Sequence, residues 1–179
     1  MFLIMRKVNY LLIALAAFST ALFYAPSCKK LLSKDVEVRN ELVFSTGGSE
    51  LVETSDKKES VLYEGDLEIN LASEIEKAGI SKNIIKSMVL RQVQIKVVSP
   101  SGFDLTLLET VKLYLVDRDN VVASSSGIEN GVLIFTIHEP ELFEKLNGEK
   151  LHIILTGTKP VEQVKLELTT DYVAKLSLL

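Results

Sequence analysis

A repeated alternation of apolar and polar residues is the feature that most limits how this chain can fold. It begins near residue 35 and returns in short stretches about ten residues apart, with turn signals between them. A period of two is typical of a β-strand with one buried face, because successive side chains of a strand point to opposite sides. In the longest clear stretch, 88–99, Val89, Val93 and Ile95 alternate with polar residues. The pattern predicts about eight or nine strands.

The strand spacing favours an all-β fold. No helical segment is long enough to supply repeated crossovers between parallel strands, so we expect antiparallel pairing. An immunoglobulin-like antiparallel β-sandwich with two or three short helices fits residues 35–179 best. The Cys–Trp–Cys framework of antibody domains is missing, because the chain has one cysteine and no tryptophan. The expected strands are 36–44, 67–71, 88–99, 111–116, 121–124, 132–137, 151–157 and 164–178.

Short helical segments are expected at three places. Ser73 and Glu76 have the spacing of a capping box, and Gly79 suits the position just after a helix. A second turn is expected over 81–86. The segment 140–147 begins with a proline and precedes a glycine, which predicts a third short helix.

The remaining segments are expected to be loops and turns. Residues 45–60 are polar and predict a loop, and 63–66 predict a turn. Asp117–Asn120 is expected to join the two strands of a hairpin. Asn130 and Gly131 form a strong tight-turn signal.

The first 27 residues have the three parts of a secretory signal peptide. Arg6 and Lys7 form a basic region, and an apolar run covers 11–23. The tripeptide Ala25, Pro26 and Ser27 supplies a small-residue cleavage region. Cys28, the only cysteine of the chain, follows it directly.

This junction resembles the lipobox of bacterial lipoproteins, and in particular that of lipoproteins of the Bacteroidota. Ala25 stands where the usual pattern has leucine, and Pro26 is atypical. The resemblance implies acylation of Cys28 and cleavage before it, so that 28–34 becomes a lipidated tether. It also implies a place in the cell envelope, with the outer membrane favoured over the inner and the domain in the periplasm or at the cell surface. Two or more acyl chains hold a protein stably at a bilayer.

Two other interpretations of this segment stay open. Ala25 and Ser27 also suit an ordinary signal peptidase, which would release a free protein. Residues 10–27 approach the length of a membrane span, so an uncleaved helical anchor is the other alternative. Translation could begin at Met1 or at Met5.

The composition of the mature chain excludes some classes of function. Removal of 1–27 takes away two basic residues and leaves a formal charge of −6, from 18 basic and 24 acidic residues. An acidic domain without a basic stripe argues against nucleic-acid binding. Since the lone cysteine lies at the cleavage junction, no disulfide is expected.

The sequence contains no recognisable catalytic or metal-binding signature, and no cofactor is expected. His138 and His152 make a poor zinc set without further cysteine or histidine. Asp117–Asn120 opens like a calcium loop, but Val122 and Ile128 stand where an EF-hand needs glycine and glutamate. Ser55 and Lys58 have the Ser-x-x-Lys spacing of penicillin-recognising enzymes, but the companion motifs Ser-Asp-Asn and Lys-Thr-Gly do not occur in the sequence. We therefore expect a protein that is not an enzyme.

One strand is apolar on both faces. Tyr114 and Val116 alternate with Val111, Leu113 and Leu115. Such a strand is usually central in a sheet or covered by another element. Tyr114 and Val116 are therefore our candidate partner surface.

Three functional hypotheses follow. The leading one is a membrane-anchored envelope lipoprotein that acts as a non-enzymatic binding or scaffolding module for another envelope protein, whose identity is unknown. The alternative is a carrier with an apolar cavity for a lipid-like ligand, lined by the strands of Val111 and Val164. The third, a fimbrial-type subunit, rests on resemblance to fimbrial lipoproteins that are trimmed after an arginine, which would here be Arg39.

Overall fold

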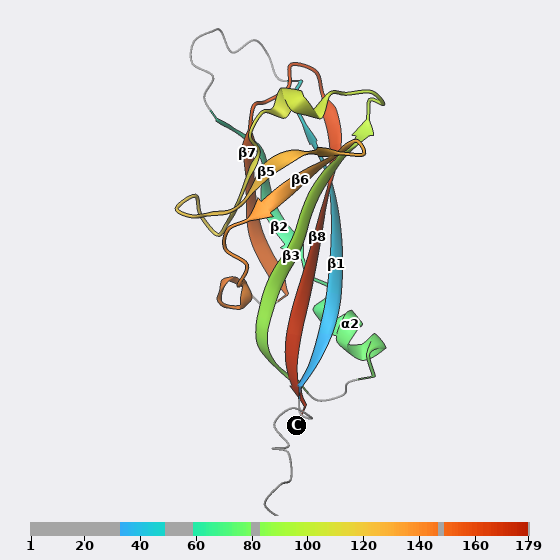
Figure 1. Cartoon of the computed structure of the whole chain (residues 1–179), viewed down its shortest axis with the longest axis vertical. Helices are drawn as coiled ribbons and strands as arrows, with labels where there is room; N and C mark the ends of the chain where they lie inside the picture. Colours follow the sequence, from blue (N-terminus) through green and yellow to red (C-terminus); the bar gives the residue numbers. More distant parts are fainter. Residues whose placement is uncertain (1–32, 49–58, 80–82, 147–148, 179) are drawn as a thin grey trace, which may run out of the picture. The chain divides into compact units, whose positions relative to one another are not determined.

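Eight strands form one continuous, strongly curled sheet in the computed structural model, which describes residues 33–48, 59–79, 83–146 and 149–178. The order of the strands across the sheet is β1-β8-β3-β6-β5-β4-β7-β2 (Figure 1). The elements are β1 (Ser33–Thr46), β2 (Ser60–Glu68), α2 (Leu71–Lys77), β3 (Asn83–Ser99), η2 (Leu105–Leu108), β4 (Lys112–Leu115), β5 (Val121–Glu129), β6 (Val132–Ile137), η3 (Phe143–Lys145), β7 (Lys150–Gly157) and β8 (Val164–Leu178).

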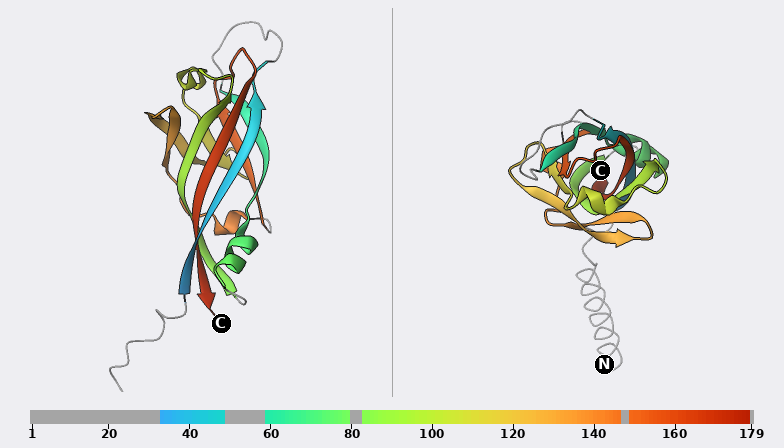
Figure 2. Two further views of the ribbon diagram at one scale, coloured as in Figure 1. Left: turned by 90° about the vertical axis from the view of Figure 1, so that its right-hand side faces the viewer. Right: turned by 90° about the horizontal axis from the view of Figure 1, so that it is seen from above.

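The prediction of an all-β fold with antiparallel pairing is confirmed. An immunoglobulin-like sandwich is not confirmed, because the strands hydrogen-bond in a single sheet and not in two sheets packed face to face. The sheet bends round so that its concave side encloses the core (Figure 2). One α-helix and two short 3₁₀ turns accompany it in the described part of the chain.

The first and last strands lie side by side, and β8 joins β1 to β3. The β3–β8 ladder is the longest described, from Asn83 opposite Leu178 to Ser99 opposite Lys165. It contains three register shifts, one of them between Leu90 and Gln92. Bulges of this kind bend a strand and increase its twist, which suits a sheet that must curl.

The inward face of the sheet carries the predicted apolar alternation. Along β1 the buried positions include Val36, Val38 and Phe44, as the period of two requires. The same face also buries Asn40, which the apolar pattern does not reveal. The fully buried large side chains of the core include Met88, Ile95, Leu108, Leu151, Ile153, Leu155, Leu166, Leu168 and Leu176.

The predicted hairpins are confirmed. β4 and β5 pair across 117–120, where the amide of Asp119 donates to Oδ1 of Asp117 at 3.1 Å. β5 and β6 are joined by Asn130 and Gly131, whose φ angles of 51° and 77° are both positive. Two positive φ angles are the requirement of the tight hairpin turn that this dipeptide favours.

Two expected turns are wrong. Residues 63–66 lie within β2, because each of them is opposite a residue of β7, with the register shift between Val61 and Tyr63. Of the turn expected over 81–86, residues 81–82 lie outside the described part of the chain, and 83–86 are not helical but begin β3, where Asn83, Ile84 and Ile85 pair with the end of β8. In both places pairing with a distant strand prevails over the local turn propensity.

The helix α2 confirms one expected boundary and corrects the other. It ends as predicted: Ala78 caps it and Gly79 follows with a φ of 72°. It begins at Leu71, earlier than the Ser73 signal, and the amide of Ala72 donates a hydrogen bond to Oε1 of Glu149 at 3.0 Å. A distant carboxylate therefore replaces the expected local cap.

The segment after Pro140 is mostly not helical. Glu141 bridges Val89, and the amide of Leu142 donates to the carbonyl of Met88 at 2.8 Å. Only η3 has helical turns there. This segment therefore covers the edge of β3 that β6 leaves unpaired.

Candidate functional site

A groove of about 680 Å³ lies over β1, β8 and β3, with α2 at its rim. We call it the β1–β8–β3 groove. Its walls are mainly charged or polar, and two other hollows among the described residues hold about 170 Å³ each. The residues that line the groove are Glu37, Val38, Arg39, Glu74, Arg91, Gln92, Asp171, Tyr172 and Val173.

A paired arginine and aspartate are among the residues that line this groove. Nε of Arg39 donates to Oδ1 of Asp171 at 2.7 Å, and Nη2 of Arg39 donates to Oδ2 of Asp171 at 2.9 Å. This two-point contact raises the pKa of Arg39, first through the hydrogen bond and then through the charge of Asp171. The two side chains therefore hold each other in place across β1 and β8. Arg39, the residue at which fimbrial trimming would cut, lies inside β1 and is engaged in this pair.

Two further charges of the groove are not engaged in this way. Glu37 on β1 and Arg91 on β3 are both exposed, and neither has an ion pair or side-chain hydrogen bond with another described residue. Arg91 lies at the register shift between Leu90 and Gln92. The groove thus presents one free carboxylate and one free guanidinium within the described part of the chain.

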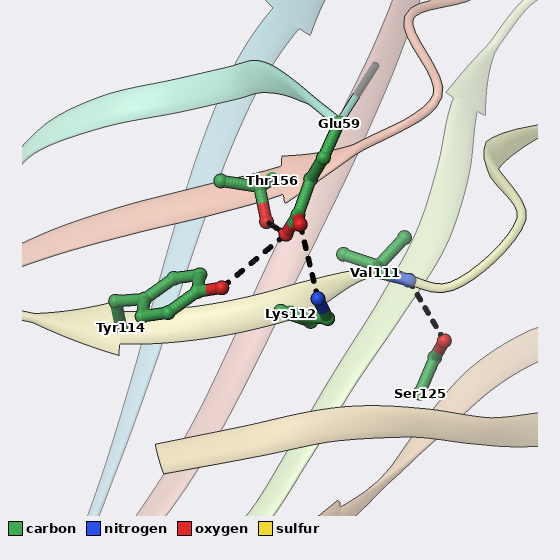
Figure 3. Close-up of polar contacts among 6 residues, drawn as sticks. All are labelled: Glu59, Val111, Lys112, Tyr114, Ser125 and Thr156. Atoms are coloured by element: carbon green, nitrogen blue, oxygen red, sulfur yellow. Dashed lines mark hydrogen bonds and ion pairs between the residues drawn. The ribbon is translucent and has the colours of Figure 1, made fainter. Parts of the chain in front are cut away.

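A second polar cluster lies on the outer face where β2, β4 and β7 meet (Figure 3). Its centre is Glu59, just before β2. Nζ of Lys112 donates to Oε2 of Glu59 at 3.0 Å, and the hydroxyl of Tyr114 donates to Oε1 at 3.3 Å. Thr156, which is only 1% exposed, also donates its hydroxyl proton to Oε1. These donors, Thr156 first and Lys112 second, hold the pKa of Glu59 below its ordinary value.

One of the smaller hollows borders this cluster. It is lined by Glu59, Glu109, Thr110, Lys112, Gly157 and Thr158. The hydroxyl of Thr158 donates to Oε2 of Glu109 at 2.8 Å. Each carboxylate that lines this hollow therefore already accepts a hydrogen bond from a neighbour, and the cluster fastens β2 to β4 and β7.

The two histidines lie apart on the surface. Nε2 of His138 is 2.8 Å from Oγ of Ser124, and Nδ1 of His152 is 2.9 Å from Oδ1 of Asp66. Glu64 is a further neighbour of His152, at 3.8 Å from Nε2. Within the described ranges, no three histidine, cysteine or acidic side chains come together as metal ligands.

The two residues of the candidate partner surface differ in exposure. Tyr114 is 7% exposed, and its hydroxyl is bound to Glu59. Val116 is 54% exposed and has a positive φ of 69°. Val116 therefore supplies nearly all of the surface that this pair could offer to a partner, and its role stays a prediction.

The predicted lipidation and cleavage residues lie outside the described part of the chain. These are Ala25, Pro26, Ser27 and Cys28. Among the helices that the structure describes, none has the length and apolar character of a membrane span.

The groove and the Glu59 cluster were both missed by reasoning from the sequence. Arg39 and Asp171 are 132 residues apart, and Glu59 and Thr156 are 97 residues apart, so no local motif joins them. Comparison with protein-family models, with curated proteins and with solved structures finds no match for this chain.

Proposed function

We propose that this protein is an envelope lipoprotein, anchored to a membrane through acylated Cys28, whose domain is a non-enzymatic binding or scaffolding module. The observation that carries the proposal is the position of the only cysteine. It follows an apolar run and the small-residue tripeptide Ala25-Pro26-Ser27. A chance location of a single cysteine at such a junction is improbable.

The distance between the anchor and the domain supports this role. The first described strand begins at Ser33, five residues after Cys28. Five residues span at most about 18 Å even when fully extended. Acylation would therefore keep the domain close to the membrane surface, where an envelope partner of the outer membrane would meet it.

The packing of the core favours a binding module over the alternative of a carrier. Val111 and Val164, whose strands would line a carrier's cavity, are both 0% exposed and lie in the packed core. A Cβ on Gly157 would lie 3.0 Å from Cδ1 of Leu62 and 3.3 Å from Cγ2 of Val111. This tight packing leaves little room for a lipid chain between these residues, whereas the β1–β8–β3 groove is open at the surface.

The test is the mass and partitioning of the full chain made in a bacterial host that acylates lipoproteins. Wild type is compared with Cys28→Ala and with Ser27→Ala, which keeps a small residue before the cysteine. We expect wild type and Ser27→Ala to start at Cys28, to carry acyl mass and to enter the detergent phase. Cys28→Ala should lose the acyl mass and leave the detergent phase or remain unprocessed. A wild-type chain without acyl mass would contradict the proposal.

A further inference from the structure

The β1–β8–β3 groove has the charges of a site for a ligand that is itself doubly charged. Glu37 on β1 and Arg91 on β3 both line the groove, with β8 between their strands, and each lacks a partner among the residues the structure describes. Arg39 and Asp171 between them satisfy each other through two hydrogen bonds. The groove therefore combines one neutral ion pair with one free negative and one free positive group.

We propose that this groove binds a short peptide with free ends, its carboxylate on Arg91 and its ammonium group on Glu37. The inference rests on the proposed role of the domain as a binding module, and it names the class of ligand. A guanidinium can donate two parallel hydrogen bonds to a carboxylate, and such a pair is among the strongest polar contacts in proteins.

The strand order sets the spacing of the two strands that carry these charges. β8 lies between β1 and β3, and neighbouring strands are about 4.8 Å apart. The strands that carry Glu37 and Arg91 are therefore roughly 10 Å apart across the sheet. A dipeptide in the extended conformation spans about 7 Å. Since both side chains can lean inward, a dipeptide fits this gap better than a single amino acid.

A bulge in β3 determines where Arg91 lies. Leu90 is opposite Tyr172 and Gln92 is opposite Asp171, so Arg91 is the extra residue with no partner on β8. Bulges release a residue from the ladder and redirect its side chain, and they are frequent next to binding sites. Arg91 is consequently free to bind a ligand without breaking a contact within the sheet.

The size of the groove and its Arg39–Asp171 pair are consistent with this ligand. About 680 Å³ lies within the usual range of small-molecule sites, roughly 300–1,000 Å³. The Arg39–Asp171 pair would not compete for the ends of the peptide, because each partner already has its counter-charge. Gln92, exposed on the same wall, offers an uncharged amide to the peptide bond.

The test is calorimetric titration of the full chain in detergent with alanyl-alanine, with its N-acetyl form and with its C-terminal amide. The variants are Arg91→Gln and Glu37→Gln, with Arg118→Gln in the exposed β4–β5 turn as the matched control. We expect wild type and Arg118→Gln to bind alanyl-alanine with equal, millimolar affinity. Arg91→Gln and Glu37→Gln should each weaken binding about tenfold, and each blocked peptide should bind about tenfold more weakly to wild type.

The pairing of peptide and variant makes the assignment specific. The C-terminal amide should bind equally to wild type and to Arg91→Gln, because neither combination contains the carboxylate–guanidinium contact. Failure of wild type to bind alanyl-alanine up to about 20 mM would overturn the proposal, as would equal binding of all three peptides. Loss of binding with only one of the two blocked forms would also overturn it. The intact mass of the same preparation reports acylation independently, so failure of the anchor and failure of the peptide site are distinguishable.

Discussion

The rings of Phe44 and Tyr63 lie 5.2 Å apart, at an interplanar angle of 48°, and connect the two edge strands of the sheet. Phe44 belongs to β1 and Tyr63 to β2, which stand at opposite ends of the strand order. The amide of Asn70 also approaches Oδ1 of Asn40, at 3.5 Å. In the described part of the chain, side chains therefore close the curled sheet where its hydrogen-bonded ladders end.

Replacement of Phe44 by alanine should destabilise the fold strongly. Phe44 is 5% exposed, and loss of a buried aromatic ring costs about 3–5 kcal/mol. Val43→Ala is the matched control on the same strand, because Val43 is 46% exposed, and it should change stability by less than about 0.5 kcal/mol. Urea unfolding followed by circular dichroism measures both, and equal losses would refute the role of the Phe44–Tyr63 contact.

A methyl group at Gly157 should also be costly. Its Cβ would lie 3.0 Å from Cδ1 of Leu62 and 3.1 Å from the carbonyl oxygen of Leu108. Overpacking of this kind costs about 1–3 kcal/mol. Gly127→Ala is the control, because nothing lies within 4 Å of a Cβ at that position. Thermal unfolding should show a lower melting temperature for Gly157→Ala alone, and an unchanged value would contradict the packing at this site.

Glu59→Gln should remove a pH-dependent part of the stability. The pKa of Glu59 is lowered in the folded state by Thr156 and Lys112. The ionised Glu59 therefore stabilises the fold at pH values above its ordinary pKa of 4.5. This contribution is lost as the pH falls through the pKa of Glu59 in the folded state. We therefore expect wild type to exceed Glu59→Gln by about 1 kcal/mol at pH 7 and the difference to shrink on acidification.

The control for this measurement is Glu68→Gln. The side chain of Glu68 is 76% exposed and lies 3.7 Å from Nζ of Lys150. An exposed pair of this kind contributes little, so its removal should leave the pH profile of urea unfolding nearly unchanged. A Glu59→Gln profile parallel to that of wild type would show that the donors around Glu59 do not stabilise its ionised form.

Tyr172 should make the fold sensitive to alkali. Burial raises the pKa of Tyr172 well above its ordinary value of 10.0. Below a pH of about 10 the tyrosine is neutral in both states, and the fold has its full stability. As the pH rises further, the tyrosine ionises only in the unfolded state, so the free energy of unfolding falls. Tyr172→Phe should flatten this loss, whereas Tyr63→Phe should retain it. Unfolding at pH values from 9 to about 11.5 tests this, and an equally steep loss in Tyr172→Phe would contradict it.

The sequence predicts most of the strands but not their arrangement. The alternation from Val36 to Phe44 and the Asn130-Gly131 turn are local signals, and both are confirmed. Whether β1 pairs within one sheet or packs across two depends on β8, more than a hundred residues away, so the period of two cannot decide it. For the same reason 63–66 looked like a turn: only its pairing with β7 shows that it is a strand.

The candidate site shows the same limit. A strict period of two through Val89, Val93 and Ile95 would place Arg91 on the same, apolar face, because such a pattern contains no bulge. The register shift between Leu90 and Gln92 changes that parity and brings Arg91 to the groove. Buried Asn40 is similarly invisible, since a polar residue in an apolar series indicates an inward position only once its neighbours are known.

The adjacency of the first and last strands also governs when the fold can form. β8 supplies the neighbours of both β1 and β3, and β8 comprises Val164–Leu178. Until these residues have been synthesised, β1 has no strand to pair with. β3 then lacks its ladder with β8, which is longer than its ladder with β6. Contacts between strands so distant in sequence also form slowly. Closure of the sheet therefore depends on the residues that are synthesised last among the described strands.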